Sequence, residues 1–305
     1  MAGSWALLGL VTTFALGSGP IADRPTVPQP IYGGTQVTPG TWRSVVALDF
    51  GDLLCTGTLI APNLVLTAAH CFRSMPAPGK VAIKFGDQSQ VPDFTAVATS
   101  YGVHPDFCDD TGECEEDYFD FAWVVLDKSV NAIYAPAVVM TEQDVWDELM
   151  YIGAPITLVG YGLNEDNVMG IKRVAETKLT NFSSTGLEFQ AGGMGIDSCQ
   201  GDSGGPAFVT DGQGNPILAG VLSRGYACGE GGFYGIPSSV LCWVSDESGV
   251  DVRPADCQSC DCLDPSPDRG GCDKCSVERP RSADALAILA PVLLALVRRR
   301  RRRAA

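Results

Sequence analysis

The chain consists largely of short β-prone runs divided by Gly, Pro, Asn and Asp residues. The clearest runs are residues 42–50, 58–66, 81–85, 121–126, 156–159 and 217–223. Residues 31–235 contain no convincing amphipathic helical pattern. Many short strands with turn signals between them predict an all-β fold with antiparallel sheets, either a sandwich or a barrel. The strand pattern by itself leaves both architectures open.

The charge of the chain argues against a nucleic-acid partner. The 305 residues have a formal net charge of −15, and six of the 21 basic residues form the C-terminal run 298–303. The rest of the chain is therefore strongly acidic. An anionic surface repels nucleic acid and attracts cationic substrates, although solubility alone also accounts for such a charge.

Twelve cysteines in a chain of this size indicate an oxidising compartment. Residues 5–16 form an apolar stretch of signal-peptide length, and the small residues at 15–17 suit a cleavage site. No Lys or Arg precedes Trp5, so the usual basic start of a signal peptide is missing. Because the cysteines need an exported context, we predict a signal peptide over residues 1–22, a short pro-segment over 23–30 and a secreted or cell-surface protein.

Residues 199–206, CQGDSGGP, have the composition of a loop that carries a nucleophile. Ser203 lies among glycines in this loop and directly follows Asp202. The backbone N–H groups of Gly201 and Ser203 can converge on the oxygen that becomes negative during acyl transfer, as an oxyanion hole requires. Serine is a weak nucleophile unless a general base activates it, so this interpretation requires a base such as histidine.

Two histidines are present to act as this base, His70 and His104. His70 lies in residues 66–71, LTAAHC, and this run together with residues 199–206 resembles the catalytic motifs of the trypsin/chymotrypsin family of serine endopeptidases. The resemblance extends over about residues 31–250 and implies that His70 is the general base. His104, in the run VHPD, matches a position where the family often has a structural histidine.

The resemblance implies two antiparallel six-stranded β-barrels with the active site in the cleft between them, and a C-terminal helix near residues 238–244. It also implies an aspartate that orients the histidine. Asp120 precedes the apolar run FAWVVL as the family's aspartate does, whereas its rival, Asp117, is not directly followed by such a run. The order His70, Asp120, Ser203 is that of the chymotrypsin type.

Asp197, six residues before the nucleophile, occupies the place of the carboxylate at the floor of the primary pocket in trypsin-like members. A buried carboxylate there rejects uncharged side chains, so the resemblance implies cleavage after Arg or Lys. It places Ser223, Gly225 and Gly235 at the substrate-binding walls. The alternative is a solvated Asp197, with specificity set elsewhere. Arg224 replaces a common Trp beside the residues upstream of the cleaved bond, and either favours acidic or small residues there or narrows the cleft.

Residues 31–34, IYGG, resemble the mature N-terminus of the family. The resemblance implies that the free ammonium of Ile31 pairs with Asp202 and thereby orders the oxyanion hole and the pocket. The preceding residues are Gln29 and Pro30, so a trypsin-like enzyme would not cut there. Either another protease frees Ile31, or the chain stays a zymogen until a partner orders it.

The family's disulfide pattern implies two bridges here, Cys55–Cys71 beside the histidine and Cys199–Cys228 beside the pocket. Cys108 and Cys114 are predicted to form a local pair within the acidic loop 106–117. The seven acidic residues of this loop offer oxygen ligands for Ca²⁺, but they match no ordered ligand spacing. We therefore predict a solvated loop, with no metal and no cofactor.

After residue 250 the composition changes to a Cys-rich linker, predicted over residues 251–282. Its two Cys-x₂-Cys pairs are similar to a zinc ribbon, although disulfides are preferred in an exported chain. The pairing stays open for Cys242, Cys257, Cys260, Cys262, Cys272 and Cys275.

Residues 283–305 contain an apolar helix and the Arg cluster. The thirteen residues 285–297 are interrupted by Pro291, and at ~1.5 Å per residue they reach about 20 Å, which is short of a hydrocarbon core of about 30 Å. The layout resembles bacterial C-terminal sorting signals of the myxobacterial type. That resemblance implies removal by a sorting enzyme, and the alternative is a plain membrane anchor.

Together these features predict a serine endopeptidase that acts through an acyl-enzyme on protein or peptide substrates containing Arg or Lys. An activating protease and a sorting enzyme or membrane are the other expected partners, and nucleic acid is not. The alternative function is a catalytically silent, zymogen-like binding or adhesive module on the same fold.

Overall fold

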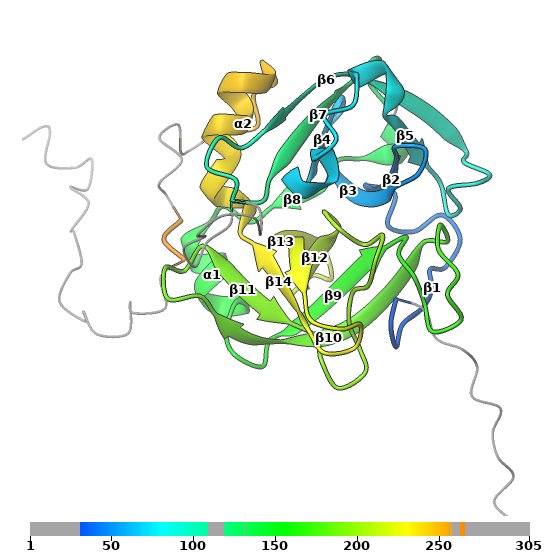
Figure 1. Cartoon of the computed structure of the whole chain (residues 1–305). Helices are drawn as coiled ribbons and strands as arrows, with labels where there is room; N and C mark the ends of the chain where they lie inside the picture. The colour runs from blue at the N-terminus through cyan, green and yellow to red at the C-terminus, as the bar shows by residue number, and fades with distance from the viewer. Residues whose placement is uncertain (1–30, 109–118, 131, 256, 258–262, 266–305) are drawn as a thin grey trace, which may run out of the picture.

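The computed structural model describes residues 31–108, 119–130, 132–255, 257 and 263–265. Within these residues the fold is all-β with two six-stranded antiparallel barrels, so the predicted barrel architecture is confirmed and the sandwich is excluded (Figure 1). The expected signal peptide, pro-segment and C-terminal tail lie outside the described residues, as do Asp117 and Cys114.

The first barrel closes in the strand order β2-β3-β4-β7-β6-β5. Its strands are β2 (Val45–Asp49), β3 (Leu54–Ala61), β4 (Leu64–Thr67), β5 (Ala82–Phe85), β6 (Phe94–Val103) and β7 (Ala122–Leu126). The predicted single run 58–66 is divided between β3 and β4, because the chain reverses at Pro62 and Asn63. Proline lacks the N–H that a central ladder position needs, which explains the turn there.

The second barrel is formed from the later part of the chain. Its strands are β9 (Pro155–Gly160), β10 (Arg173–Phe182), β11 (Glu188–Ala191), β12 (Pro206–Thr210), β13 (Pro216–Gly225) and β14 (Gly232–Gly235). Two short strands join this sheet: β1 (Thr35–Gln36) pairs with β10, and β8 (Val138–Val139) runs parallel to β13. The N-terminal segment is thereby tied to the second barrel, while β2 begins the first.

The apolar runs are explained by burial on both faces. Along β2, Val46 and Leu48 pack inside the first barrel, whereas Val45 and Ala47 pack in a cluster shared with the second barrel. That shared cluster also holds Phe208 of β12. A strand that is buried on both sides is apolar throughout instead of alternating.

Two helices complete the described fold. The C-terminal helix α2 (Leu241–Ser248) follows a 3₁₀ turn at Pro237–Val240 and ends at Gly249, whose φ of 72° is a common glycine helix stop. It begins three residues later than the predicted helix and packs against β6 and β7. The sequence missed α1 (Gln143–Leu149), because seven residues with one fully buried side chain, Trp146, show too little periodicity. No helix in the described part of the chain has both the length and the apolar character to cross a membrane.

The described residues after residue 250 also pack on the second barrel. Cys257 and Leu263 are buried, and Leu263 belongs to the core cluster that contains Trp146. The backbone N–H of Asp264 donates to Gln143 Oε1 at 2.9 Å. The start of the Cys-rich linker is therefore part of the folded body in the described residues.

Candidate active site

A short 3₁₀ turn after β4, Ala69–Phe72, positions His70. Asp120 stands directly before β7 and is buried. Its carboxylate accepts a hydrogen bond from the His70 backbone N–H at 2.9 Å and lies 2.7 Å from His70 Nδ1. Because a carboxylate accepts, the proton of the imidazole lies on Nδ1 in this pair, and Nε2 is left as the basic nitrogen.

Ser223 on β13 adds a third hydrogen bond to this carboxylate. Its hydroxyl donates to Asp120 Oδ2 at 2.8 Å. The sequence placed Ser223 only at the substrate-binding wall, because a serine in a strand carries no local signal of its distant partner. The structure places its hydroxyl against the Asp120 carboxylate, which it helps to hold in position.

The nucleophile loop lies against the histidine loop. The Ser203 carbonyl accepts from the Thr56 backbone N–H at 2.9 Å, and the Cys71 sulfur is 3.9 Å from the same oxygen. Gly204 has a φ of 76°, and a Cβ added there would overlap the Thr67 hydroxyl and lie 2.6 Å from Ala68 N. Among the described residues the Ser203 hydroxyl makes no hydrogen bond to His70; such contacts commonly tighten only when substrate is bound.

The predicted oxyanion donors are the backbone N–H groups of Gly201 and Ser203. Gly201 has a φ of 96°, a region that glycine adopts without steric cost, and its carbonyl accepts from the Thr56 hydroxyl at 2.9 Å. Within the described ranges, neither the Gly201 N–H nor the Ser203 N–H donates to a protein acceptor. Both N–H groups therefore remain available to an acceptor from outside the described chain.

Asp197 is 1% exposed and is held by backbone and hydroxyl donors. The Gly231 N–H donates to Oδ2 at 2.7 Å, and the Ser198 hydroxyl lies 3.3 Å from Oδ1. Burial raises the pKa of Asp197 above its ordinary value, and the hydrogen bonds from Gly231 and Ser198 offset part of this shift. In the part of the chain that the structure describes, no cationic side chain forms an ion pair with it.

Several glycines surround this carboxylate. A Cβ at Gly192 would lie 2.6 Å from Asp197 Oδ1, and one at Gly232 would lie 3.1 Å from the Ser198 hydroxyl. The predicted wall residue Gly225 pairs with Gly232 across β13 and β14. Our sequence analysis did not assign Gly192, Gly231 or Gly232 to the site. The glycine-rich runs GGMG and GEGG, which contain them, were the available signal that the backbone approaches other groups closely there.

Gly235, the other predicted wall glycine, has different neighbours. It pairs with Val221 and Glu188, and a Cβ there would lie 2.5 Å from the Phe121 ring. Phe121 belongs to the cluster between the barrels. Gly235 thus makes room for Phe121, whereas Gly232, three residues earlier, lies beside the hydroxyl of Ser198, the residue that follows Asp197.

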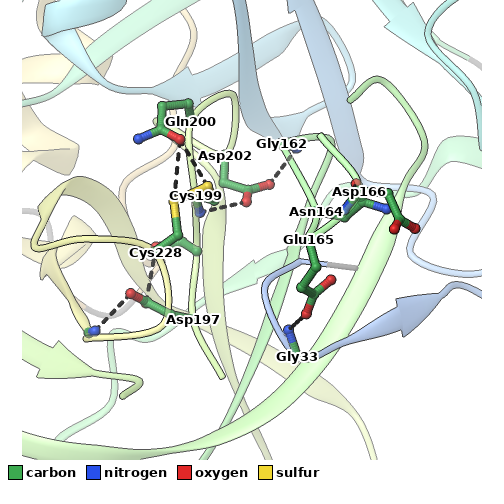
Figure 2. Close-up of a disulfide and its surroundings, with 12 residues drawn as sticks. Gly33, Gly162, Asn164, Glu165, Asp166, Asp197, Cys199, Gln200, Asp202 and Cys228 are labelled. Carbon is green, nitrogen blue, oxygen red and sulfur yellow. Dashed lines mark hydrogen bonds between the residues drawn. A yellow bond between two sulfur atoms is a disulfide. The ribbon is translucent and has the colours of Figure 1, made fainter. Parts of the chain in front are cut away.

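Asp202 is 2% exposed and accepts from the Gly162 N–H at 2.7 Å and the Cys199 N–H at 3.0 Å (Figure 2). Burial raises the pKa of this carboxyl to about 7. The buried Ile31 side chain and Asp202 line the same small cavity. The described residues include no cation paired with Asp202.

Arg224, the residue that departs from the family pattern, is paired with a buried acid. Its Nη1 and Nη2 donate to Oε1 and Oε2 of Glu188 at 2.8 and 2.7 Å. The guanidinium also lies over the Phe233 ring, 4.4 Å from its centroid. Glu188 carried no signal in the sequence, because the strand β11 that holds it is far from β13 along the chain.

The predicted disulfides Cys55–Cys71 and Cys199–Cys228 are confirmed. Cys199–Cys228 joins the nucleophile loop to the loop beside Asp197 (Figure 2). The cysteines Cys108, Cys242 and Cys257 are also disulfide-bonded. The possible partners Cys114, Cys260, Cys262, Cys272 and Cys275 lie outside the described residues.

His104 is packed apart from the triad. Its ring stacks on Phe119 at 5.0 Å and meets the Trp243 ring edge-on at 4.7 Å. Burial lowers its pKa, and its Nδ1 accepts from the Asp106 N–H at 3.2 Å. These contacts fit the structural role expected for this histidine.

Comparison with known proteins agrees with this geometry. A family model described as Trypsin matches residues 31–244. Coagulation factor XII of Sus scrofa is 28% identical over 248 residues, covering 72% of this chain and 39% of that protein. Coagulation factor XI of Bos taurus is 28% identical over 238 residues, covering 70% of this chain and 36% of that protein. The chain thus spans well under half the length of these relatives.

The segment matched by the family model makes up most of the chain. It contains both barrels and the residues His70, Asp120 and Ser203 at their junction. The chain therefore belongs to the trypsin family, and its body is a trypsin-family serine protease domain.

Proposed function

We propose that this protein is a serine endopeptidase that hydrolyses peptide bonds after Arg or Lys. The observation that carries the proposal is the His70–Asp120 pair at 2.7 Å, with the Ser203 loop packed against the histidine loop. The buried Asp197 carboxylate, which has no cationic partner among the described residues, supports the choice of a cationic substrate side chain.

In the proposed mechanism Ser203 Oγ attacks the substrate carbonyl carbon while His70 Nε2 takes the hydroxyl proton. The carbonyl oxygen becomes an oxyanion, which accepts hydrogen bonds from the N–H groups of Gly201 and Ser203. His70 then gives its proton to the leaving amine, and the acyl group remains on Ser203. Water, deprotonated by His70, releases the acid and regenerates the serine.

Asp120 keeps the imidazole in the tautomer that these steps need and stabilises the imidazolium that forms. Two hydrogen bonds to Asp120 come from His70 and one from Ser223, so the carboxylate has little freedom to turn away. Asp120 takes no proton in this scheme.

Activation is proposed to need a free Ile31. A cut after Pro30 would create an ammonium beside Asp202, which is buried and has backbone donors but no cationic partner among the described residues. Because Gln29 and Pro30 precede the bond, the cutting enzyme is a protease of different specificity. Export, and surface retention through residues 283–305 by a membrane or a sorting enzyme, are proposals that rest on the sequence alone.

The test is to purify the exported protein, sequence its N-terminus and assay it on Arg and Lys chromogenic peptides. Chains that begin at Ile31 should hydrolyse these peptides, and Ser203→Ala should lower kcat/KM by at least about 10⁴-fold. Matched peptides with Glu or Phe at the cleaved position should be poor substrates. Chains that begin at Ile31 and show no Ser203-dependent hydrolysis would support the silent binding module instead.

A further inference from the structure

Arg224 lies between the catalytic residues and the pocket carboxylate. Its neighbour Ser223 donates to Asp120, and its other neighbour, Gly225, pairs with Gly232 beside the Asp197 pocket. A substrate with its reacting carbonyl at Ser203 and its side chain toward Asp197 therefore has its preceding residues beside Arg224.

The edge of β13 at Ser223–Gly225 is open to such a chain. β12 pairs with β13 only as far as Val221, and no described strand pairs with residues 223–225 on that side. An extended peptide can add to an open strand edge through backbone hydrogen bonds. The side chains of that edge then decide which substrate residues are accepted.

The charge of Arg224 is already neutralised. Glu188 is only 4% exposed, and its two oxygens take one N–H from each terminal nitrogen of the guanidinium. Two parallel charge-assisted hydrogen bonds fix the plane of the guanidinium as well as its position. Arg224 keeps a quarter of its side chain exposed, so the paired group still borders solvent.

Two aromatic rings continue the surface that the Arg224 guanidinium forms. Phe233 lies under the guanidinium, and the Tyr226 ring is 5.4 Å from Phe233. Tyr226 is 62% exposed. Phe233 thus links the guanidinium of Arg224, which lies over its ring, to the Tyr226 ring, which is tilted against it by 58°. Such planar groups favour contact with apolar and aromatic side chains.

We propose that Arg224, positioned and neutralised by Glu188, forms with Tyr226 a wall that selects an apolar or aromatic side chain upstream of the cleaved bond. The pair carries no net charge and lies in an acidic body, so an acidic substrate residue gains no attraction there. Glu188 acts as a positioning residue because it is buried and reaches substrate only through Arg224. This inference rests on the proposed endopeptidase function.

The experiment compares kcat/KM for peptides that end in Arg at the cleaved bond and differ only in carrying Phe, Gly or Glu two or three residues upstream. A blocked arginine ester, which has no upstream side chain, reports whether each variant has a working triad. We expect the parent enzyme to prefer Phe over Glu by about tenfold or more.

Glu188→Gln leaves the guanidinium without its carboxylate, so the Phe-to-Glu ratio should fall about tenfold. The double variant Arg224→Gln/Glu188→Gln removes both charges and should return the ratio to within about threefold of the parent. Glu176→Gln, the same change at an exposed position of β10, is the matched control and should leave the ratio unchanged.

Tyr226→Ala is an exposed change that should fold normally, and it should lower the Phe-to-Gly ratio about threefold or more. An unchanged Phe-to-Glu ratio in an ester-active Glu188→Gln enzyme overturns the inference. If Glu188→Gln does not fold, an unchanged Phe-to-Gly ratio in Tyr226→Ala overturns it instead. A parent enzyme that begins at Ile31 and hydrolyses neither the ester nor the peptides overturns the proposed function, and the inference with it.

Discussion

Four buried carboxylates dominate the chemistry of the described residues, and each is stabilised differently. Asp120 is held by His70 and Ser223, and Glu188 is held by Arg224. Asp197 and Asp202 accept only backbone and hydroxyl donors within the described chain. Because a buried charge without a counter-charge is costly, these two sites are where an added cation has most to contribute.

The titration of Asp202 should make the stability of the uncut chain depend on pH. Burial raises the pKa of this carboxyl from 3.8 to about 7, so the folded chain binds the proton more tightly than the unfolded chain. The resulting contribution to the free energy of unfolding is full below about pH 4 and is lost as the pH rises through about 7. Asp202→Asn has no carboxyl to titrate and should not show this loss. The free energy of unfolding of the variant, relative to that of its parent, should therefore rise by on the order of 1–3 kcal/mol between pH 5 and pH 8.

Urea unfolding of uncut chains at pH 5, 6.5 and 8 measures this difference, in a Ser203→Ala background that prevents self-digestion. Asp52→Asn, at an exposed position, is the control and should show no such trend. A stability difference between Asp202→Asn and its parent that is the same at pH 5 and pH 8 would contradict the expectation.

At the scale of elements, β13 changes its role along its length. From Pro216 to Val221 it pairs with β12, with β8 on its other side at Ile217 and Leu218, and its pairing with β14 begins at Val221. Its register against β14 shifts between Leu222 and Arg224, and such irregularities often redirect side chains near active sites. Past this point the strand supplies Ser223 to Asp120 and Arg224 to Glu188, so one element connects the candidate triad to the proposed substrate wall.

The contact between the nucleophile loop and the histidine loop depends on Gly204. Gly204→Ala adds a Cβ that overlaps the Thr67 hydroxyl, at a φ of 76° that alanine rarely adopts. We expect a loss of about 2 kcal/mol or more in unfolding free energy and at least a tenfold lower kcat, because the loops must separate.

Thermal unfolding and hydrolysis of an Arg peptide measure both effects. Gly212→Ala is the matched control, since a Cβ there meets nothing within 4 Å, and it should behave like the parent. Equal stability and kcat for the two alanine variants would show that Gly204 is not needed for close packing.

At the scale of the whole molecule, the candidate site lies where two barrels meet, and the first and last described segments pack against these barrels. The N-terminal segment pairs with β10, while α2 packs against β6 and β7. Beyond α2 the described residues continue to the region of α1, where Leu263 enters the core of the second barrel. The folded body therefore includes part of the Cys-rich segment.

Leu263→Ala should consequently destabilise the protease domain itself. Leu263 is 8% exposed in a core cluster with Trp146, and removal of a buried leucine side chain costs about 2 kcal/mol or more. The melting temperature should fall by about 4–8 °C. Leu53→Ala, at a 44% exposed leucine, is the control and should shift it far less. A Leu263→Ala protein that melts with the parent would mean that this segment contributes nothing to the fold.

The sequence predicted secondary structure well where a short run of apolar, β-prone residues stood between turn residues. The runs 81–85 and 121–126 correspond closely to β5 and β7. The helix α1 was missed because it is short and owes its place to the burial of Trp146, which only the assembled barrel provides. A Pro-Asn turn within an apolar run was likewise overlooked, although its residues are turn formers.

The sequence by itself determined the family, the barrels through that resemblance, and the disulfides Cys55–Cys71 and Cys199–Cys228, and it named His70, Asp120 and Ser203 as the triad. The family, the barrels and the two disulfides are confirmed, because each follows from short contiguous motifs whose chemistry few other residues can supply. The catalytic roles of His70, Asp120 and Ser203 stay predictions. Only the tertiary structure decided that Arg224 pairs with Glu188, that Ser223 holds Asp120 and that Gly192 lies beside the Asp197 carboxylate. Such contacts arise from strand register and burial between distant segments, which no local run of residues encodes.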